Sequence, residues 1–258
     1  MSLIQAIILA IVEGVTEFLP ISSTGHLVLT ATLLHINQTD FVKSFEIIIQ
    51  LGAILAVVVL YFRLLRGHIA LWKTLLVSFL PSMVVGLVLY KVIKAVLLGN
   101  PYVVLVMLFL GGIVILLLER KYKSMKSHTQ VVTEVSFKQA LFIGLCQSLS
   151  VIPGVSRAAA TILGGMYVGL TRETAVEFSF LLALPTMLAA SSLDIFESHA
   201  SFAIGENFFL LSVGFLVSFG VAFLSMKWLI SFIRSHTFTP FGVYRIVISI
   251  LYYVFVLR

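Results

Sequence analysis

The sequence predicts an all-α integral membrane protein with six transmembrane helices and two re-entrant helical hairpins. The first observation is composition: of 258 residues, 60% are hydrophobic and only 11% are charged, and the mean hydropathy is +1.13. A soluble domain carries about 25% charged residues, so composition argues against a water-soluble fold. The other two observations are six long apolar stretches and two shorter apolar segments that each break at a proline.

The six long stretches are apolar enough to cross a hydrocarbon core of roughly 30 Å. Basic residues gather in short segments between them, as in cytoplasmic loops, so the formal charge of +6 does not indicate nucleic-acid binding. The positive-inside rule places the segments around Arg63 and Lys121 in the cytoplasm and the end of the last span on the outer side. The predicted spans are 45–62, 75–90, 102–118, 178–196, 208–226 and 243–257.

The first short segment, Leu3–Thr16, would form a helix of about 21 Å at ~1.5 Å per residue, which is too short to cross. It breaks at Pro20, because proline disfavours a helical conformation in the residue before it. Serine favours the position before a helix, so a second short helix is expected to start near Ser22. We interpret this segment as a re-entrant hairpin.

The segment 137–170 repeats this plan, with a break at Pro153, a possible helix cap at Ser156 and a helix end at Gly169. Residues 5–24 align with 139–157 after one deletion, which pairs Ser23 with Ser156. With three spans in each half, the second hairpin enters from the opposite side, which is an inverted-topology repeat. The alternative is chance similarity between apolar segments.

The domain organisation follows from this repeat. We expect a single membrane domain over 1–258, with repeat halves of about 1–118 and 136–258. A basic cytoplasmic loop, 119–135, which contains Lys123 and Lys126, would join the halves.

Charged and titratable side chains within the short helices mark the candidate site. An ionised side chain costs about 2.5–3.5 kcal/mol at the middle of a membrane, so such residues indicate function. Glu13 and Glu17 are four residues apart and share one helix face. Two neighbouring carboxylates either share a proton or hold a cation. The alternative is a hydrogen-bonded pair that only fixes the hairpin.

The start of the helix expected after Pro20 is suited to binding an anion. Ser22, Ser23, Thr24 and Gly25 have backbone N–H groups without intrahelical partners, at the positive end of a helix dipole. These residues could equally be an ordinary cap. His26 lies three residues after Ser23, a spacing that suits a nucleophile and its base, although a structural histidine is the alternative.

Arg157 follows Ser156 at the start of the second short helix. Its planar guanidinium suits phosphate oxygens, and a structural ion pair with Glu13 or Glu17 is the alternative. If the two hairpin tips meet, carboxylates for a cation, a hydroxyl beside an imidazole and donors for a multiply charged anion converge. This combination favours phosphoryl transfer to a serine or to water.

Two segments carry a family resemblance. EGVTEFLPISSTGH (13–26) and PGVSRAAAT (153–161) resemble the two motifs of the undecaprenyl-diphosphatase family of bacitracin-resistance membrane phosphatases, and the similarity extends over essentially the whole chain. The family's second motif usually reads Ser-Arg-Ser-Gly, whereas Arg157 is followed here by Ala158 and Ala159.

The resemblance implies hydrolysis of undecaprenyl diphosphate to undecaprenyl phosphate, which recycles the lipid carrier for cell-wall synthesis and confers bacitracin resistance. It also implies a divalent cation (Mg²⁺ or Ca²⁺), a bacterial inner membrane, an active site facing the outer, periplasmic side, and a possible homodimer. By motif position, the implied catalytic residues are Glu17, Ser23, His26 and Arg157; the implied substrate-binding residues are Ser22, Thr24, Gly25 and Ser156; and the implied metal ligands are Glu13 and Glu17.

Two other functions compete with this one. A lipid-phosphate flippase or secondary transporter would also use an inverted repeat with broken helices. The pair Ser23 and His26 favours the enzyme, because transport does not need it. A phosphatidic-acid-phosphatase type of enzyme would place a histidine about six residues after the motif arginine, but position 163 is leucine.

Overall fold

The computed structural model describes residues 1–92, 101–122, 129–197 and 204–257. Within these ranges the chain is helical, apart from turns and one isolated β-bridge. Two lysines of the expected basic loop, Lys123 and Lys126, lie outside the described residues. The α-helices are α1 (Leu3–Thr16), α2 (Ser23–Leu33), α3 (Asp40–Leu60), α4 (Phe62–Gly67), α5 (Ile69–Val92), α6 (Pro101–Tyr122), α7 (Phe137–Ser148), α8 (Arg157–Tyr167), α9 (Arg172–Glu197), α10 (Ile204–Ile233) and α11 (Thr239–Tyr252).

Six of the helices are long and apolar enough to cross a membrane, which confirms the predicted number of spans. Several begin earlier than predicted: α5 begins at Ile69 and α9 at Arg172, more than a turn before positions 75 and 178. The hydrophobic pattern marks only the part of each helix that needs an apolar environment, and polar turns extend it. The spanning segments are Asp40–Leu60, Ile69–Leu89, Pro101–Tyr122, Arg172–Leu193, Phe208–Ile233 and Thr239–Val256.

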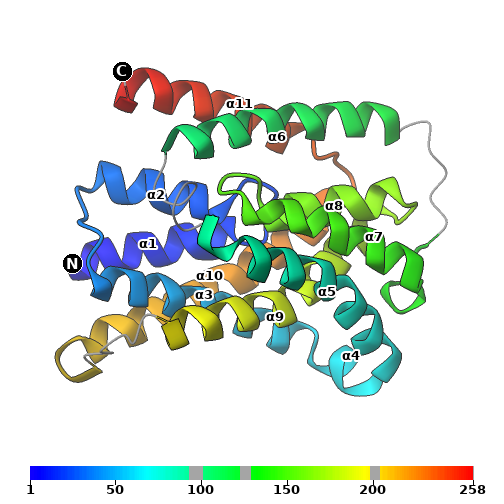
Figure 1. Cartoon of the computed structure of the whole chain (residues 1–258), viewed down its shortest axis with the longest axis horizontal. Coiled ribbons are helices and arrows are strands. Elements are labelled where there is room, and N and C mark those ends of the chain that lie inside the picture. The colour runs from blue at the N-terminus through cyan, green and yellow to red at the C-terminus, as the bar shows by residue number, and fades with distance from the viewer. Residues whose placement is uncertain (93–100, 123–128, 198–203, 258) are drawn as a thin grey trace.

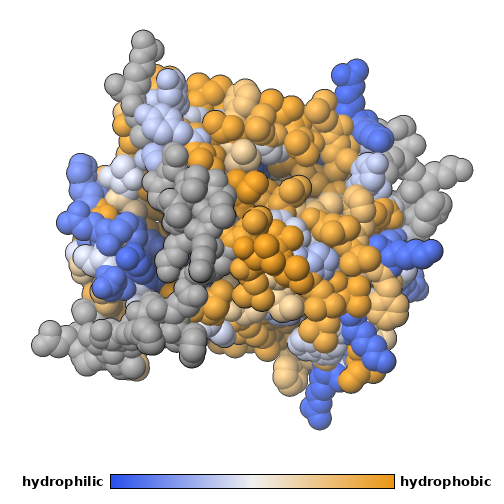
Figure 2. Space-filling view, in the orientation of Figure 1, coloured by the Kyte–Doolittle hydropathy of each residue, from blue (hydrophilic) through white to orange (hydrophobic). Residues whose placement is uncertain are grey.

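The short helices occupy opposite ends of the molecule. In Figure 1, α1 and α2 lie towards the end that holds the N-terminus, and α7 and α8 lie towards the other end. Figure 2 shows apolar residues across the middle of the visible face, with hydrophilic residues gathered at its left and right edges. This distribution suits a bilayer crossed along the long axis of the molecule. The re-entrant placement of the two hairpins remains a prediction.

The two short-helix pairs share their local geometry. Ser2 caps α1 and Ser136 caps α7 through the same reciprocal capping box, with a glutamine at the third helical position. Ser22 and Ser156 cap α2 and α8, and both have left-handed backbones, with φ of 73° and 78°. The same sequence offset relates Ser2 to Ser136 and Ser22 to Ser156. Ser22, rather than the Ser23 of the alignment with one deletion, therefore corresponds in geometry to Ser156.

The short helices α1 and α7 approach longer helices through glycines. A Cβ atom at Gly14 would lie 2.8 Å from the carbonyl oxygen of Ser218 in α10, and one at Gly144 would overlap the backbone of α5. Lipid chains are as apolar as side chains, so membrane helices associate through close packing rather than through hydrophobic burial. Small residues at these contacts allow the close approach of α1 to α10 and of α7 to α5.

An ion pair on a buried carboxylate joins three helices at one end of the molecule. Glu119, which is 2% exposed, accepts hydrogen bonds from Arg172 Nε (3.0 Å), Arg172 Nη2 (2.6 Å) and the backbone N–H of Phe238 (2.8 Å). Glu119 belongs to α6, which continues through Tyr122. The predicted loop boundary at position 119 was therefore too early, because the pairing with Arg172 lets this carboxylate stay within a buried helix.

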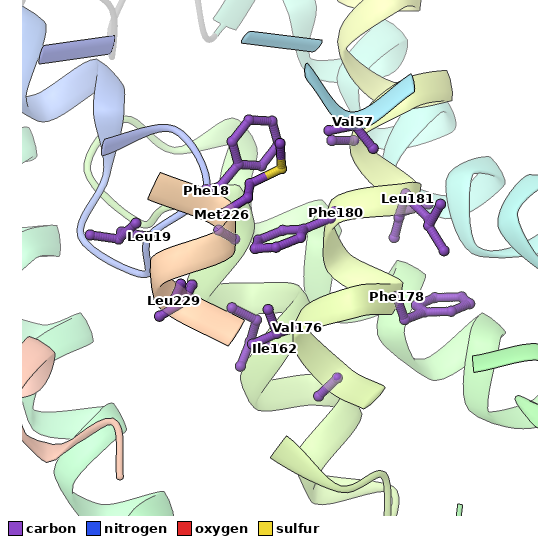
Figure 3. Packing of buried hydrophobic residues seen from close by; sticks show 14 of the residues in the cluster. Phe18, Leu19, Val57, Ile162, Val176, Phe178, Phe180, Leu181, Met226 and Leu229 are labelled. Carbon is purple, nitrogen blue, oxygen red and sulfur yellow. The ribbon is translucent and has the colours of Figure 1, made fainter. Parts of the chain in front are cut away.

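The main core cluster includes residues of the turn that joins α1 to α2. Phe18 is fully buried and meets Phe180 of α9 edge-on, with ring centroids 5.2 Å apart and an interplanar angle of 76°. Figure 3 shows Phe18 beside Met226 of α10, with Ile162 of α8 in the same cluster. Phe18 follows Glu17 in the chain, so this packing holds the turn that carries the candidate site.

Candidate active site

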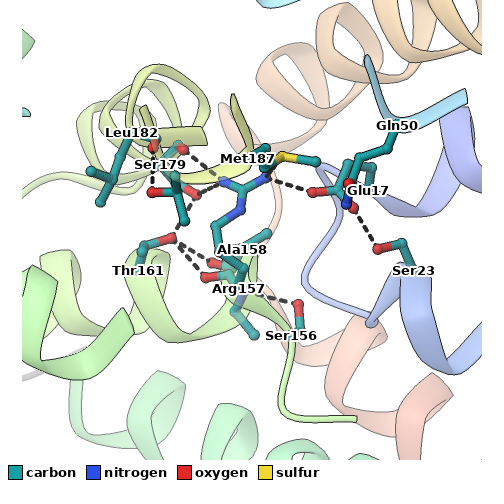
Figure 4. Close-up of polar contacts among 12 residues, drawn as sticks. Glu17, Ser23, Gln50, Ser156, Arg157, Ala158, Thr161, Ser179, Leu182 and Met187 are labelled. Carbon is teal, nitrogen blue, oxygen red and sulfur yellow. Dashed lines mark hydrogen bonds and ion pairs between the residues drawn. The ribbon is translucent and has the colours of Figure 1, made fainter. Parts of the chain in front are cut away.

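The first turn (residues 17–22, between α1 and α2) and the second turn (residues 149–156, between α7 and α8) meet at an ion pair between Glu17 and Arg157, the first residue of α8. Arg157 Nη2 donates to Glu17 Oε1 at 2.9 Å, and the two side chains are only 10% and 6% exposed. The second carboxylate oxygen, Oε2, accepts a short hydrogen bond from Ser23 Oγ. Figure 4 shows Glu17 between Ser23 and Arg157, which come from α2 and α8. One carboxylate thus bridges a hydroxyl and a guanidinium from opposite halves of the chain.

Arg157 is held on three sides. Its Nη1 donates to the carbonyl oxygen of Ser179 in α9 at 2.7 Å, and its Cζ lies 5.7 Å from the centre of the Phe18 ring. Thr161 bonds back to the Arg157 carbonyl and also contacts the Ser179 hydroxyl at 2.7 Å. The buried Nε of Arg157 has no hydrogen-bond partner among the described residues. The guanidinium is therefore oriented but keeps one donor available.

Glu13 lies one turn before Glu17 and is 1% exposed. The two carboxyl groups are close enough to interact electrostatically. Two neighbouring carboxyl groups can share a proton or hold a cation. No cluster of three or more histidine, cysteine, aspartate or glutamate side chains that could hold a metal occurs in the described part of the chain. The pair fits Mg²⁺, which typically binds one or two carboxylates together with water and substrate phosphates.

The start of α2 is arranged as predicted for an N-terminal turn. Ser22 is the cap residue, and its hydroxyl accepts the N–H of Gly25 at 3.4 Å. The N–H groups of Ser23 and Thr24, the first two residues of the helix, have no intrahelical acceptor. Thr24 is exposed, whereas Gly25 is buried against Val104 of α6. Gly25 thus serves packing and the cap, while Ser23 and Thr24 present donors.

His26 is oriented by groups other than Ser23. Its Nδ1 lies 2.8 Å from the carbonyl oxygen of Ser22, and its Nε2 lies 2.7 Å from the hydroxyl of Tyr244 in α11. A carbonyl only accepts, so Nδ1 carries the proton and Nε2 of the neutral ring accepts from Tyr244. The rings of His26 and Tyr244 also stack, at 5.6 Å and 10°. The hydroxyl–imidazole contact expected from the spacing is replaced by a contact between Ser23 and Glu17.

Ser156 has the role in α8 that Ser22 has in α2. Its hydroxyl accepts the N–H of Ala159 at 3.1 Å, and Arg157 is the first residue of the helix. Ala158 and Ala159 are both buried. Where the second motif of the resembling family has Ser-Gly after the arginine, this chain has two small apolar side chains packed into the core.

Sequence reasoning missed three residues of this region: Ser179, Tyr244 and Arg245. Arg245 is fully buried in α11, and its guanidinium reaches the backbone of both turns. A signal for it was present, because a single arginine stands inside the apolar stretch 243–257, and charge within a span indicates a special role. Ser179 and Tyr244 carry no comparable signal.

Comparison with known proteins supports the resemblance noted in the sequence. A protein of Aquifex aeolicus (strain VF5) named undecaprenyl-diphosphatase is 51% identical over 253 residues, with 98% of each chain covered. One of the same name from Persephonella marina (strain DSM 14350 / EX-H1) is 49% identical over 257 residues, with 100% of each chain covered. The family model described as Bacitracin resistance protein BacA matches residues 6–251. The motifs at the two turns, the six spans and these full-length matches agree, and the chain belongs to the BacA family of bacitracin-resistance proteins.

Proposed function

We propose that this protein hydrolyses undecaprenyl diphosphate to undecaprenyl phosphate and inorganic phosphate. Full-length relatives carry the name of this activity. The observation that carries the proposal is the convergence of Glu17, Ser23 and Arg157 from two distant segments. The reaction regenerates the lipid carrier for cell-wall synthesis, and the recycled carrier accounts for bacitracin resistance.

Binding of the diphosphate follows from the donors at the two turns. Both α2 and α8 begin at this site, with Ser23 and Arg157 as their first residues, and helix N-termini attract anions. Arg157 adds a positive charge and the unused Nε donor. A terminal phosphate between Ser23 and Arg157 would satisfy these donors together.

The geometry favours Ser23 as the nucleophile. Its oxygen attacks the terminal phosphorus, the bond from phosphorus to the bridging oxygen breaks, and that oxygen leaves as part of undecaprenyl phosphate. The serine proton passes to Glu17, which already accepts it in a hydrogen bond. Water then hydrolyses the phosphoserine and releases inorganic phosphate, which restores the hydroxyl of Ser23.

His26 offers the competing route, in which it activates water directly. Its Nε2 accepts from Tyr244, so this route requires that the tyrosine hydroxyl gives way to water. In the route through Ser23, His26 and Tyr244 instead line the side of the α2 turn that faces α11.

Glu13 and Glu17 would hold a divalent cation, Mg²⁺ or Ca²⁺, completed by phosphate oxygens and water. When bound, it would neutralise charge on the diphosphate. Glu13 forms no ion pair with another described residue, so its carboxylate would be available as a ligand.

The six spans make this a multi-pass membrane protein. We place it in the bacterial inner membrane with the α1–α2 turn reached from the outer, periplasmic side. The exposed Thr24 gives a test: in cells, a Thr24→Cys variant with Cys146→Ala should react with a membrane-impermeant maleimide. Reaction only after the cells are opened would contradict this orientation.

The central experiment measures phosphate release from undecaprenyl diphosphate by the purified full chain in detergent with Mg²⁺ or Ca²⁺. Turnover without an ion gradient separates the enzyme from a transporter or flippase. Ser23→Ala should lower kcat by at least about 10³-fold if serine is the nucleophile. Ser192→Ala, an exposed serine elsewhere, is the matched control. No release by the wild-type chain would refute the function, and substantial release by Ser23→Ala would favour water activated by His26.

A further inference from the structure

We propose that Arg245 is a positioning residue that holds the two turns of the site in register with each other. This inference rests on the proposed hydrolysis, because it assigns a task within that site. Arg245 touches none of the groups that would meet the phosphate. Its contacts are with the backbone of the two turns that carry these groups and with the backbone of α6.

The guanidinium of Arg245 uses all of its donors on backbone carbonyls. An arginine side chain has five N–H donors in a fixed plane. The structure gives this one five hydrogen bonds: Nε to Leu108 (3.2 Å), Nη1 to Pro20 (3.2 Å) and Val155 (3.1 Å), and Nη2 to Met107 (3.0 Å) and Gly154 (2.9 Å).

Three chain segments are joined by these bonds. Pro20 belongs to the first turn, Gly154 and Val155 belong to the second turn, and the other two carbonyls belong to α6. Nη1 bonds one carbonyl from each turn. A single rigid group thus sets the distance between the two turns and the position of both turns relative to α6.

The bonded carbonyls lie next to the reacting groups in the chain. Pro20 stands two residues before Ser22, and Val155 stands two residues before Arg157. A shift of either turn would change the separation of Arg157 from Glu17 and Ser23. Misplacement of catalytic groups by about 1 Å can lower a rate by about 10²-fold. Arg245 therefore influences the chemistry without contacting the substrate.

The surroundings of Arg245 suit these five backbone hydrogen bonds. The side chain is 0% exposed, and no carboxylate pairs with it in the described parts of the chain. Gly111 of α6 faces the guanidinium, and a Cβ atom there would overlap Nη2. The guanidinium therefore fits between α6 and α11 only because residue 111 is a glycine and has no side chain.

Lysine cannot replace this function. It keeps the positive charge but has three donors on one atom, which cannot bond all five carbonyls. Arg245→Lys and Arg245→Gln therefore separate geometry from charge. Gly111→Ala is a second kind of variant, because it keeps the arginine and displaces its guanidinium.

The kinetic test uses the purified full chain with undecaprenyl diphosphate. Arg245→Lys, Arg245→Gln and Gly111→Ala should each lower kcat by about 100-fold and change KM by less than about threefold. Arg172→Lys is the matched control, because it perturbs a partly buried, paired arginine outside the site and should leave kcat within about twofold. Size-exclusion profiles and circular dichroism select the folded variants.

A second readout does not depend on activity. In a Cys146→Ala background, spin labels at Leu33→Cys, at the exposed end of α2, and Leu149→Cys, at the exposed start of the second turn, report the distance between the two hairpins. The distance distribution should be narrow in the parent and broad when Arg245→Lys or Gly111→Ala is added. It should stay narrow with Arg172→Lys.

The outcomes separate this inference from the proposed function. A folded Arg245→Gln variant with kcat within twofold of the wild type, or an unchanged distance distribution in Arg245→Lys, would overturn the positioning role. A wild-type chain that releases no phosphate would refute the hydrolysis, while the distance measurement would still test whether Arg245 holds the turns together.

Discussion

Replacing Glu17 with glutamine tests whether one carboxylate joins the two halves of the site. The ion pair from Glu17 to Arg157 is 2.9 Å long, and both side chains are at most 10% exposed. A surface pair would contribute about 0–1 kcal/mol, whereas breaking a buried pair costs about 3–5 kcal/mol. Arg157 keeps its bond to the Ser179 carbonyl, so we expect the low end, about 3 kcal/mol, in the free energy of unfolding.

A double-mutant cycle isolates the pair itself. Glu17→Gln and Arg157→Gln should each destabilise the protein, and the double variant should be more stable than the sum of the single losses predicts by about 2 kcal/mol. The free energies come from reversible unfolding in detergent, checked for two-state behaviour. All three variants should lose phosphate release. Additive losses, within about 0.5 kcal/mol, would show that the two side chains do not interact and would refute the assembled site.

Three further predictions concern the cation, the histidine and helix packing. Glu13→Gln should raise the concentration of Mg²⁺ or Ca²⁺ needed for half-maximal activity by about 10–100-fold after treatment with chelator, and an unchanged titration would contradict a role as ligand. Tyr244→Phe removes the donor to His26 Nε2 and should lower the free energy of unfolding by about 1 kcal/mol while kcat stays within about twofold of the wild type, because the route through Ser23 does not use this bond; a higher kcat would favour water activated by His26. Gly144→Ala forces a Cβ against the backbone of α5 and should cost about 1–3 kcal/mol, visible as a lower Tm, whereas Gly220→Ala, with open space around it, should leave Tm unchanged.

The number of spans could be read from the sequence because hydrocarbon thickness imposes a minimum apolar length. Their ends could not, because helices continue past the apolar core wherever a polar residue finds a partner. Glu119 illustrates this limit: its charge suggested a loop, and its partner Arg172 is far away in the chain.

The candidate site also has one part that the sequence predicts and another that it does not. Local geometry was predictable: Ser22 and Ser156 cap their helices, and the spacing of Glu13 and Glu17 does place their carboxyl groups together. The partner of His26 was not predictable, because Tyr244 comes from another helix. Spacing shows which residues share a helix face, but not which neighbouring helix covers that face.

The position of Arg245 has a consequence for how the protein is made. During synthesis the first turn emerges early, the second much later, and the arginine that bonds both arrives only with α11. Until then, the carbonyls of Pro20 and Gly154 lack their donor. The translocon or membrane must therefore tolerate two polar turns in an unfinished chain. Maturation of the catalytic centre is thus expected to be a late event in biogenesis, and ribosome-bound intermediates that stop before α11 should be inserted but inactive.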